Sequence, residues 1–368
     1  MKFQLLTEYY PPFLWNFYKE NSNYSSLTYS QLLELLLNEL FADTGAIHHY
    51  IQQSGNQSQL IISNCEPLQK KWAIENNVQF TNENWKMEIA LAQVKLYKPD
   101  VFYIESVFEF FGDFISQIKP HCKLIVSWIS TPFSSNLPLK GIDLFLSSTP
   151  KFVEGFKQQG FKAEYMLPAF DERVLERIKN FDKKDIPFSF VGGWSNVHLK
   201  RKEALKTLVQ KTPIKLWGYG YKKSFPKRNL AYFKNMLFPE NKEILYAYQG
   251  EAWGLKMLEI IQRSVITFNI HESLLEGNVG NMRMFEASGV GTLILNDYGH
   301  NLSDLFEVGK EIESYKTIEE AVEKANYYIS NPAKAIEMGK NAQRKTLTQY
   351  NYNNYVSNLL NYCKSNLK

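Results

Sequence analysis

The feature that most constrains the fold of this chain is an alternation of short apolar runs with amphipathic segments of helical length. The runs VFYI (101–104), LIVSW (124–128) and LFLS (144–147) are rich in β-branched and aromatic residues, which is typical of strands buried on both faces of a sheet. Segments of helical length at 108–118 and 151–159 alternate with them. Strands that alternate with helices predict an α/β fold with a parallel, doubly wound sheet.

The alternation continues along the whole chain and is interrupted once. Further strands are predicted at 1–6, 60–63, 188–191, 214–217, 265–270 and 292–295, and further helices at 27–41, 83–96, 199–209, 252–261, 281–288, 318–329 and 332–346. The interruption is the charged run DERVLERIKNFDKKD between Pro168 and Pro187, which is typical of a connection between domains. We therefore predict a Rossmann-like domain at 1–168, a linker at 169–186, a second Rossmann-like domain at 187–345, and a C-terminal helix at 346–368 for which a return to the first domain is one option.

Composition excludes several classes of protein. The 42 Lys and Arg residues exceed the 38 Asp and Glu residues only slightly and are dispersed, so a dedicated nucleic-acid binder is not expected. No uninterrupted apolar run approaches the ~18–20 residues of a membrane span, and the start MKFQLLTEYY lacks the apolar stretch of a signal peptide. The three cysteines are far apart and show no CxxC spacing. We therefore predict a cytoplasmic protein.

The residues that follow each predicted strand are the candidates for chemistry, because ligands of open α/β sheets bind beyond the carboxyl ends of the strands. His198 and Arg201 follow the strand at 188–191. The strand at 214–217 is followed by glycines that let backbone approach a flat ligand closely. The candidates after these strands and after the strand at 265–270 are Gly218, Tyr219, Gly220, His271, Gly280, Asn281, Arg283 and Glu286.

The segment GNVGN before the predicted helix at 281–288 suits a phosphate. A helix N-terminus presents free N–H groups and about half a positive charge, which favours an anion such as a pyrophosphate. Arg283 and Glu286 are three positions apart and therefore share a helix face. The guanidinium can pair with phosphate oxygens, and the carboxylate can accept hydrogen bonds from a ribose diol. The alternative is an ordinary Arg–Glu pair on a solvated helix.

Six segments carry a resemblance to a known family. In the second half these are EAWGLKMLEIIQRSVITFNIH, EGNVGNMRMFEASGVGTLILND and LSDLFEVGKEIESYKTIEEAVEKANYYI, and in the first half YYPPFL, SNCEPLQKKWA and GIDLFLSSTPKFVEGFKQQGFKAEYMLPAFD. They resemble GT-B glycosyltransferases of the "glycosyl transferases group 1" branch, which includes the spore-maturation proteins. Glu286, Gly289 and Gly291 match the second half of that family's Glu-x7-Glu motif, whereas the first Glu falls on Asn278, which is not acidic.

The resemblance implies a GT-B fold, in which two Rossmann-like domains face a central cleft, and a glycosyltransferase with a nucleotide-diphosphate sugar as donor substrate and no further cofactor. It implies that Glu286 holds the ribose, and that Arg283, Asn281 and the amides after Gly280 hold the diphosphate or the donor sugar. His198 and Arg201 would be basic ligands of the diphosphate, Gly218 and Gly220 would flank the base, Trp217 or Tyr219 would stack on it, and His271 would contact a phosphate.

The sequence also bears on metal ions and on the acceptor. The chain has no Asp-x-Asp pair for a divalent cation, so we predict a metal-independent reaction in which Arg283 and His271 help to stabilise the leaving diphosphate. Glu8, after the first strand, and Glu105, after VFYI, are the candidate bases for an acceptor hydroxyl. A retaining enzyme would need neither, because the donor phosphate would serve as base. For each glutamate a surface or loop-capping role is the alternative.

The predicted function is transfer of a sugar from a nucleotide-diphosphate sugar to a glycan, glycolipid or protein acceptor, as in polysaccharide biosynthesis. Two alternatives stay open: a nucleotide-sugar epimerase or hydrolase of the same fold, and a non-catalytic structural protein that keeps the fold. A dehydrogenase is disfavoured because no strand is followed by a full GxGxxG motif. The aromatic stretches at 14–18 and 230–233 would suit either core packing or a peripheral contact with the inner face of the membrane.

Overall fold

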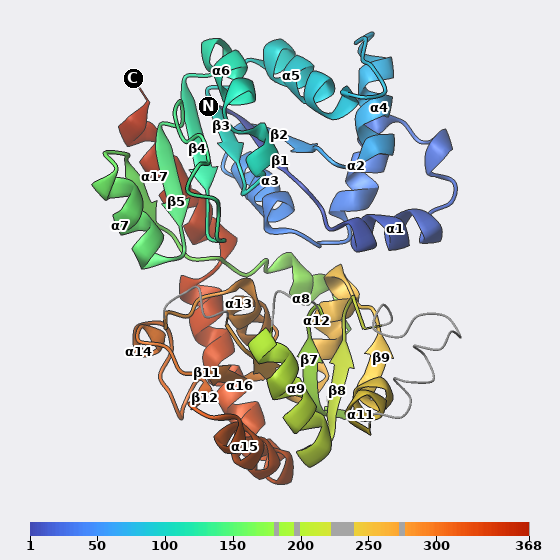
Figure 1. Ribbon diagram of the computed structural model, residues 1–368, viewed down its shortest axis with the longest axis vertical. Helices are drawn as coiled ribbons and strands as arrows, with labels where there is room; N and C mark the ends of the chain where they lie inside the picture. The colour runs from blue at the N-terminus through green and yellow to red at the C-terminus, as the bar shows by residue number, and fades with distance from the viewer. Residues whose placement is uncertain (180–183, 195–198, 222–238, 272–276, 368) are drawn as a thin grey trace. The chain divides into compact units, whose positions relative to one another are not determined.

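The computed structural model describes residues 1–179, 184–194, 199–221, 239–271 and 277–367. Within these residues the chain forms two compact units (Figure 1), each built on a parallel sheet of six strands. Unit 1 comprises Met1–Leu167 and Tyr352–Lys368, and unit 2 comprises Pro168–Asn351. The described residues of the predicted linker at 169–186 therefore belong to unit 2, and the return to unit 1 begins at Tyr352 rather than at residue 346.

The sheet of unit 1 has the strand order β2-β1-β3-β4-β5-β6. Its strands are β1 (Lys2–Thr7), β2 (Gln57–Ile62), β3 (Val101–Ile104), β4 (Leu124–Trp128), β5 (Leu144–Ser147) and β6 (Ala163–Tyr165). Its helices are α1 (Pro11–Glu20), α2 (Tyr29–Leu37), α3 (Asp43–Gln53), α4 (Glu66–Glu75), α5 (Trp85–Tyr97), α6 (Asp113–Ile118), α7 (Pro150–Gln158) and α17 (Tyr352–Asn366), with short 3₁₀ helices η1 (Tyr24–Ser26), η2 (Phe108–Phe110) and η3 (Lys119–His121).

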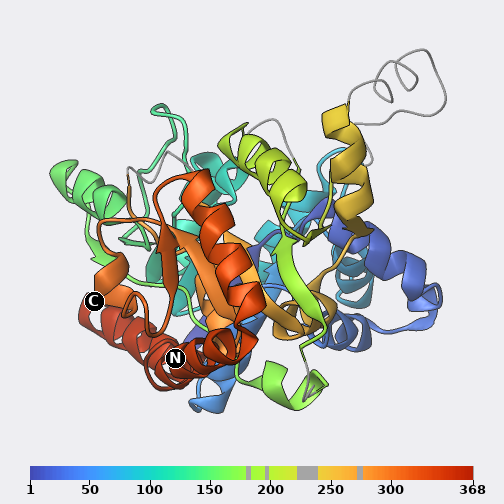
Figure 2. The same ribbon diagram turned by 90° about the horizontal axis from the view of Figure 1, so that it is seen from below.

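Helices cover both faces of this sheet. Apolar side chains of α5, α6 and α7 form one buried cluster with those of β3, β4 and β5. On the other side, α17 packs against α3, which itself contacts β1 and β2. Figure 1 shows the red C-terminal helix α17 among the blue and green elements of unit 1, and Figure 2 gives the view turned by 90°. The helix α17 therefore belongs to unit 1, although the segment before it belongs to unit 2.

The sheet of unit 2 has the strand order β12-β11-β10-β7-β8-β9. Its strands are β7 (Ile186–Val191), β8 (Ile214–Trp217), β9 (Tyr248–Gly250), β10 (Ser264–Asn269), β11 (Leu293–Asp297) and β12 (Glu313–Tyr315). Its helices are α8 (Arg173–Arg177), α9 (Leu199–Lys211), α11 (Pro239–Ala247), α12 (Gly254–Gln262), α13 (Met282–Gly289), α14 (Leu302–Leu305), α15 (Ile318–Ser330) and α16 (Pro332–Gln349). A buried cluster joins β7, β8, β10 and β11 to α9, α15 and α16.

The predicted α/β class with two doubly wound sheets is confirmed, and the differences from the predicted elements have local causes. The predicted helix at 27–41 ends at Leu37, because the chain turns at Leu40 (φ +48°) before α3 begins. Pro187, just before the strand predicted at 188–191, lies inside β7. It is tolerated there because the pairing of β7 with β8 begins only at Phe188, so β8 requires no N–H from Pro187.

The aromatic stretch at 14–18 divides between the core and the surface. Leu14 and Phe17 are buried, whereas Trp15 is 65% exposed and lies near the ammonium of Lys19. The second aromatic stretch, at 230–233, lies outside the described residues. None of the helices in the described ranges has the length and apolar character needed to cross a membrane.

Both sheets have one point where the strand order reverses. In unit 1 the chain passes from β1 to β2 on one side and then to β3 on the other, so β1 and β3 flank the reversal. In unit 2 the flanking strands are β7 and β10. Loops at the carboxyl ends of such strand pairs leave in opposite directions and expose side chains to a ligand. These two edges are the candidate functional regions.

Candidate functional site

The first candidate region is the carboxyl edge of β7 and β10 in unit 2. His271 follows β10, and Gly280 and Asn281 lead into α13. Residues 272–276 between them lie outside the described residues. The local fold therefore brings the end of a buried strand beside the start of a helix, as the sequence analysis predicted.

His271 is the centre of this region and is 7% exposed. Its Nδ1 lies 2.7 Å from Oδ1 of Asp297, the last residue of β11, and the other Asp297 oxygen accepts the backbone N–H of His271 at 2.9 Å. At the opposite side of the ring, Nε2 accepts the N–H groups of Gly280 at 3.1 Å and Asn281 at 3.3 Å. Both ring nitrogens are thus hydrogen-bonded within unit 2.

The side chain of Asn281 caps α13. Its Oδ1 accepts the backbone N–H of Met284 at 3.3 Å, which is the usual arrangement of an N-cap. The same amide exchanges two hydrogen bonds, of 3.0 and 3.1 Å, with the buried side chain of Asn269. Asn269 also donates to Oδ1 of the buried Asn296 at 2.7 Å. The Asn281 side chain, predicted to hold a diphosphate or a sugar, is therefore engaged in fixing the helix start.

A neighbouring loop braces the segment before α13. The side-chain amide of Asn301 accepts the N–H of Val279 at 2.8 Å and donates to its carbonyl oxygen at 2.9 Å. The N–H of His300 donates to the carbonyl oxygen of Gly277 at 2.7 Å. Gly277 and Gly280 have φ of +82° and +138°, a region that favours glycine. The described part of the GNVGN segment therefore has one well-defined path.

Two backbone N–H groups in the first turn of α13 have no hydrogen-bond partner among the described residues. The first N–H groups of any helix lack intrahelical partners. Here Asn281 donates to His271 and Met284 to the Asn281 side chain. Within the described residues, no hydrogen bond involves the N–H of Met282 or Arg283. These two donors are available to an anion.

Arg283 and Glu286 form an ion pair on α13. Nη1 of Arg283 lies 2.7 Å from a carboxylate oxygen of Glu286, and the two side chains are 19% and 16% exposed. Nη1 also contacts Sδ of Met257 on α12 at 3.1 Å. The pair is thus largely buried, unlike Lys310 and Glu307, which have the same spacing but are 63% and 60% exposed. An ordinary pair on a solvated helix does not describe Arg283 and Glu286.

Gly218 and Gly220 allow two loops to touch. A Cβ on Gly218 (φ +132°) would lie 2.2 Å from the carbonyl oxygen of Gly192, and one on Gly220 (φ +91°) would lie 2.3 Å from that of Trp194. The N–H of Gly192 donates to Trp217, and that of Trp194 donates to Tyr219, both at 2.9 Å. The packing of the loops after β7 and β8 therefore accounts for these glycines, without the close approach of a ligand that the sequence analysis invoked.

Aromatic and basic side chains accompany these loops. The rings of Tyr219 and Trp253, which precedes α12, are stacked with centroids 5.6 Å apart and planes 15° apart. Arg201, near the start of α9, donates to the carbonyl oxygen of Gly193 at 3.4 Å and lies over the Phe190 ring. His198 lies outside the described residues.

The second candidate region is the carboxyl edge of β1 and β3 in unit 1. Glu8 follows β1 and pairs with Lys86 of α5, which also pairs with Glu109. Burial raises the pKa of the Glu8 carboxyl above its ordinary value; the Lys86 ammonium opposes this shift and the Glu109 carboxylate adds to it. Glu8 is thus a partly buried carboxyl with a fixed cationic neighbour.

Glu105 follows β3 and belongs to a pair of carboxyl groups. It accepts a hydrogen bond from the Thr7 hydroxyl and is hydrogen-bonded to the side chain of Asp43, at the start of α3. Burial, followed by the charge of Asp43, raises the pKa of Glu105 well above its ordinary value, and burial also raises the pKa of Asp43. Two adjacent half-buried carboxyls cannot both ionise readily, so ionisation of the pair is shifted to higher pH.

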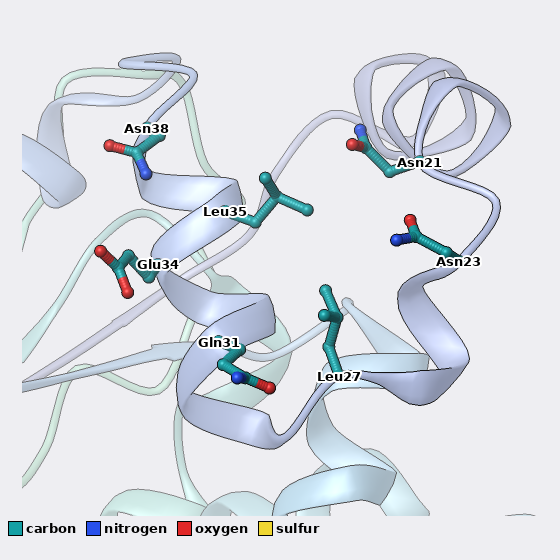
Figure 3. A pocket seen from close by; sticks show the side chains of 7 residues that line it. All are labelled: Asn21, Asn23, Leu27, Gln31, Glu34, Leu35 and Asn38. Atoms are coloured by element: carbon teal, nitrogen blue, oxygen red, sulfur yellow. The ribbon is translucent and has the colours of Figure 1, made fainter.

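Unit 1 also has an open hollow of about 330 Å³ outside this edge. Figure 3 shows its lining side chains, which come from the segment after α1, from α2 and from the residue that follows α2: Asn21, Asn23, Leu27, Gln31, Glu34, Leu35 and Asn38. All of them follow the C-terminal end of α1, so none comes directly after β1 in the sequence. The hollow is therefore not formed by the residues that follow the strands.

Sequence reasoning missed several residues of these regions. Asp297 ends the apolar run LILND, so the rule applied to other strand ends would have found it. Trp253 and Asp43 follow no strand directly; each precedes or begins a helix. Asn269 lies inside the strand that was predicted at 265–270. No local pattern in the sequence marks these last three, because only the packing brings them to the sites.

Part of the chain is similar to a known family, and its fold is shared with solved structures. Residues 199–361 match the family model described as "Glycosyl transferase-like". A comparison with curated protein sequences gives no match. Among solved structures, sucrose-phosphate synthase from Thermosynechococcus elongatus aligns with a TM-score of 0.58 at 9% identity, over 99% of this chain and 98% of that one.

Two further structures align over almost their whole length. HepE from Anabaena, in complex with UDP-glucose, gives a TM-score of 0.60 at 12% identity and covers 98% of this chain and 100% of that one. A glycosyltransferase from Rickettsia africae gives 0.58 at 11% identity, over 100% and 98%. The shared architecture is the GT-B fold. The chain therefore has the GT-B fold, and residues 199–361 are similar to the glycosyl transferase-like family.

Proposed function

We propose that the chain transfers a sugar from a nucleoside-diphosphate sugar to a glycan, glycolipid or protein acceptor, and that unit 2 binds the donor at the start of α13. The observation that carries this proposal is the pair of unused N–H groups of Met282 and Arg283 among the described residues, beside the Arg283 guanidinium. Backbone donors and the helix dipole at such a position attract an anion, and a diphosphate is the anionic part of the donor.

Arg283 and Glu286 are proposed to divide the donor between them. Arg283 would pair with the diphosphate, and Glu286 would accept hydrogen bonds from the ribose hydroxyls. Their mutual contact leaves capacity for this, because a guanidinium has five N–H donors and a carboxylate two oxygens. Their low exposure shields such contacts from water, which strengthens charge-assisted hydrogen bonds.

The base is proposed to lie near the loops after β7 and β8. The stacked rings of Tyr219 and Trp253 offer an aromatic face for a nucleobase. Gly218 and Gly220 would lie beside it, and Arg201 and His198 are proposed as further basic groups near the diphosphate. The structure with UDP-glucose bound is that of Anabaena HepE, so uridine nucleotides are the first to test here.

The reaction is proposed to need no metal ion. The charge on the leaving diphosphate would be stabilised by Arg283 and by the N–H groups of Met282 and Arg283. Donors fixed by the fold need little reorganisation when charge develops, which is how such groups lower a barrier. Addition of EDTA in the binding and turnover assays tests this part of the proposal.

The acceptor hydroxyl is proposed to meet unit 1. If the reaction inverts the anomeric centre, Glu8 and Glu105 are the candidate bases at the edge of β1 and β3. A carboxyl whose pKa is raised by burial is a stronger base once it is ionised. Cytoplasmic location and a peripheral contact with a membrane stay predictions of the sequence; the exposed Trp15 is one aromatic group that such a contact could use.

The test is calorimetric titration with UDP, GDP, dTDP, CMP and NAD in the presence of EDTA. We expect one nucleoside diphosphate to bind selectively, and Glu286→Gln to weaken its binding by about 1.5–3 kcal/mol, the cost of losing hydrogen bonds to a charged group. A thermal-shift assay gives a second readout, since a ligand at about 100 times its Kd adds about 2.7 kcal/mol of stability.

The control for this titration is Glu307→Gln. Glu307 forms an exposed ion pair with Lys310, and these two residues are three positions apart, as Arg283 and Glu286 are. We expect the Glu307→Gln protein to bind nucleotide as the unaltered protein does. Equal affinities for the Glu286→Gln and Glu307→Gln proteins would remove Glu286 from the donor site. Absence of binding by every nucleoside diphosphate would refute the proposed donor site.

A further inference from the structure

The ring of His271 connects three segments of unit 2. His271 follows β10, contacts Asp297 at the end of β11, and accepts two N–H groups from the segment before α13. The ring side chain is 3% exposed, so water does not replace these partners. A buried polar ring with all its contacts within the protein has its protonation fixed by those contacts.

The contacts select one form of the imidazole. Two N–H groups converge on Nε2, so this nitrogen must present a lone pair and carries no proton. The proton of the neutral ring is then on Nδ1, where it is donated to Asp297 at 2.7 Å. The second Asp297 oxygen accepts the backbone N–H of His271, which fixes the carboxylate itself. Only the neutral ring with its proton on Nδ1 satisfies all of these hydrogen bonds.

We infer that His271 and Asp297 are positioning residues of the donor site: they hold the N–H groups of Gly280 and Asn281 on Nε2 and thereby leave those of Met282 and Arg283 to bind the diphosphate. The inference rests on the proposed donor site and deepens it. It gives His271 a positioning role in place of the direct phosphate contact expected from the sequence.

The geometry explains why the N–H groups up to residue 281 bind His271 and those from residue 282 are left for an anion. An N–H group makes one strong hydrogen bond, and those of Gly280 and Asn281 are directed at the ring. The side chain of Asn281 takes the N–H of Met284. His271 and Asn281 thus occupy the donors on either side of Met282 and Arg283. The anion is left with two adjacent N–H groups and the guanidinium of Arg283.

Two substitutions of His271 separate this role from simple packing. In His271→Gln the side-chain oxygen can reach the place of Nε2 and accept the two N–H groups. In His271→Asn the shorter amide lies near the place of Nδ1, so it can still bond Asp297 but cannot reach the segment before α13. Asp297→Asn offers an N–H to Nδ1 and so favours a proton on Nε2, where it would oppose the N–H groups of Gly280 and Asn281.

The experiment measures amide hydrogen exchange at residues 277–281 together with nucleotide titration. Without nucleotide, we expect exchange of Gly280 and Asn281 to be at least tenfold faster in His271→Asn and Asp297→Asn, and close to that of the unaltered protein in His271→Gln. Exchange of the β10 amides reports whether each variant is folded. Affinity for UDP, or for whichever diphosphate the titration selects, should fall about tenfold in the first two variants and recover in His271→Gln.

A spectroscopic measurement tests the tautomer directly. In protein with nitrogen-15 in its six histidines, we expect the His271 ring to show a neutral form with the proton on Nδ1. A proton on Nε2, or equal exchange at Gly280 and Asn281 in the Asn and Gln variants, would overturn the inference. If exchange responds as expected but no nucleoside diphosphate binds the unaltered protein, the donor site fails, and with it the role given to Met282 and Arg283.

Discussion

The edges where the two sheets reverse their strand order have the same topology and opposite chemistry. In unit 1 the residues that follow β1 and β3 are Glu8 and Glu105. Both carry carboxyl groups, and burial raises the pKa of each. In unit 2 the corresponding edge after β7 and β10 presents backbone N–H groups and the guanidinium of Arg283. One edge can hold or accept protons, and the other can bind an anion.

A parallel sheet supplies the position of a site and leaves its chemistry to the side chains. Parallel strands end together, so residues distant in sequence meet at each edge whatever their type. The side chains at an edge then determine whether it can accept a proton from a hydroxyl or bind an anion such as a phosphate. Single substitutions in one unit at a time test this difference.

Arg283→Ala should have the largest effect, because it removes the positive side chain of the unit 2 edge. We expect release of nucleoside diphosphate from the donor sugar to slow by about 100-fold or more, the scale for losing one group that stabilises developing negative charge. Arg283→Lys should recover part of the rate, since it keeps the charge without the planar geometry. Steady-state rates with Lys310→Ala as control would show this. Unchanged turnover would mean that Arg283 serves the fold alone.

Gly218→Ala should destabilise unit 2 through the contact between its two loops. An alanine at positive φ costs about 1–3 kcal/mol, and here its Cβ also overlaps the Gly192 carbonyl oxygen. Gly250→Ala is the matched control, because Gly250 has φ +117° with no atom within 4 Å of the added Cβ. Urea unfolding should show a larger loss for Gly218→Ala, by about 1–3 kcal/mol of overpacking strain. Equal losses, with nucleotide binding lost only in Gly218→Ala, would favour the close approach of a ligand.

Glu105→Gln should change how the stability of unit 1 depends on pH. Because the pKa of Glu105 is raised in the folded protein, the folded state binds more protons than the unfolded state above the ordinary value of 4.5. Stability contributed by the protonated carboxyl is therefore complete below that value and lost as pH rises towards the raised pKa. The slope for one proton is at most about 1.4 kcal/mol per pH unit.

Glutamine resembles the protonated carboxyl and cannot ionise, so the Glu105→Gln protein should lose less stability as pH increases. Denaturant unfolding at a series of pH values upward from the ordinary glutamate pKa of 4.5 would measure this. Glu109→Gln, at a more exposed carboxyl of the same edge, is the control. Parallel stability curves for the Glu105→Gln protein and the unaltered protein would show that Glu105 and Asp43 do not share a proton in solution.

Most of the architecture was accessible from the sequence because buried parallel strands have a clear pattern. The runs VFYI, LIVSW and LFLS are β3, β4 and β5, with the predicted bounds. The three-residue strands β6, β9 and β12 were missed, since segments this short carry little periodicity. The helix α1 was missed as well. It begins with Pro11 and Pro12, which are compatible with a first helical turn but also typical of loops.

The sequence alone determined which residues follow the strands, and with them the neighbourhood of both candidate regions. His271, Arg283 and Glu286 were found in this way, because strand ends and helix starts are local properties of the chain. The contacts of each group, by contrast, depend on how the chain folds. Asp297 orients His271, Asn269 holds Asn281, Asp43 shares hydrogen bonding with Glu105, and Gly192 requires Gly218. The reason is physical: protonation, capping and close packing depend on atoms a few ångströms apart in space, and these partners are separated by 12 to 62 positions along the chain.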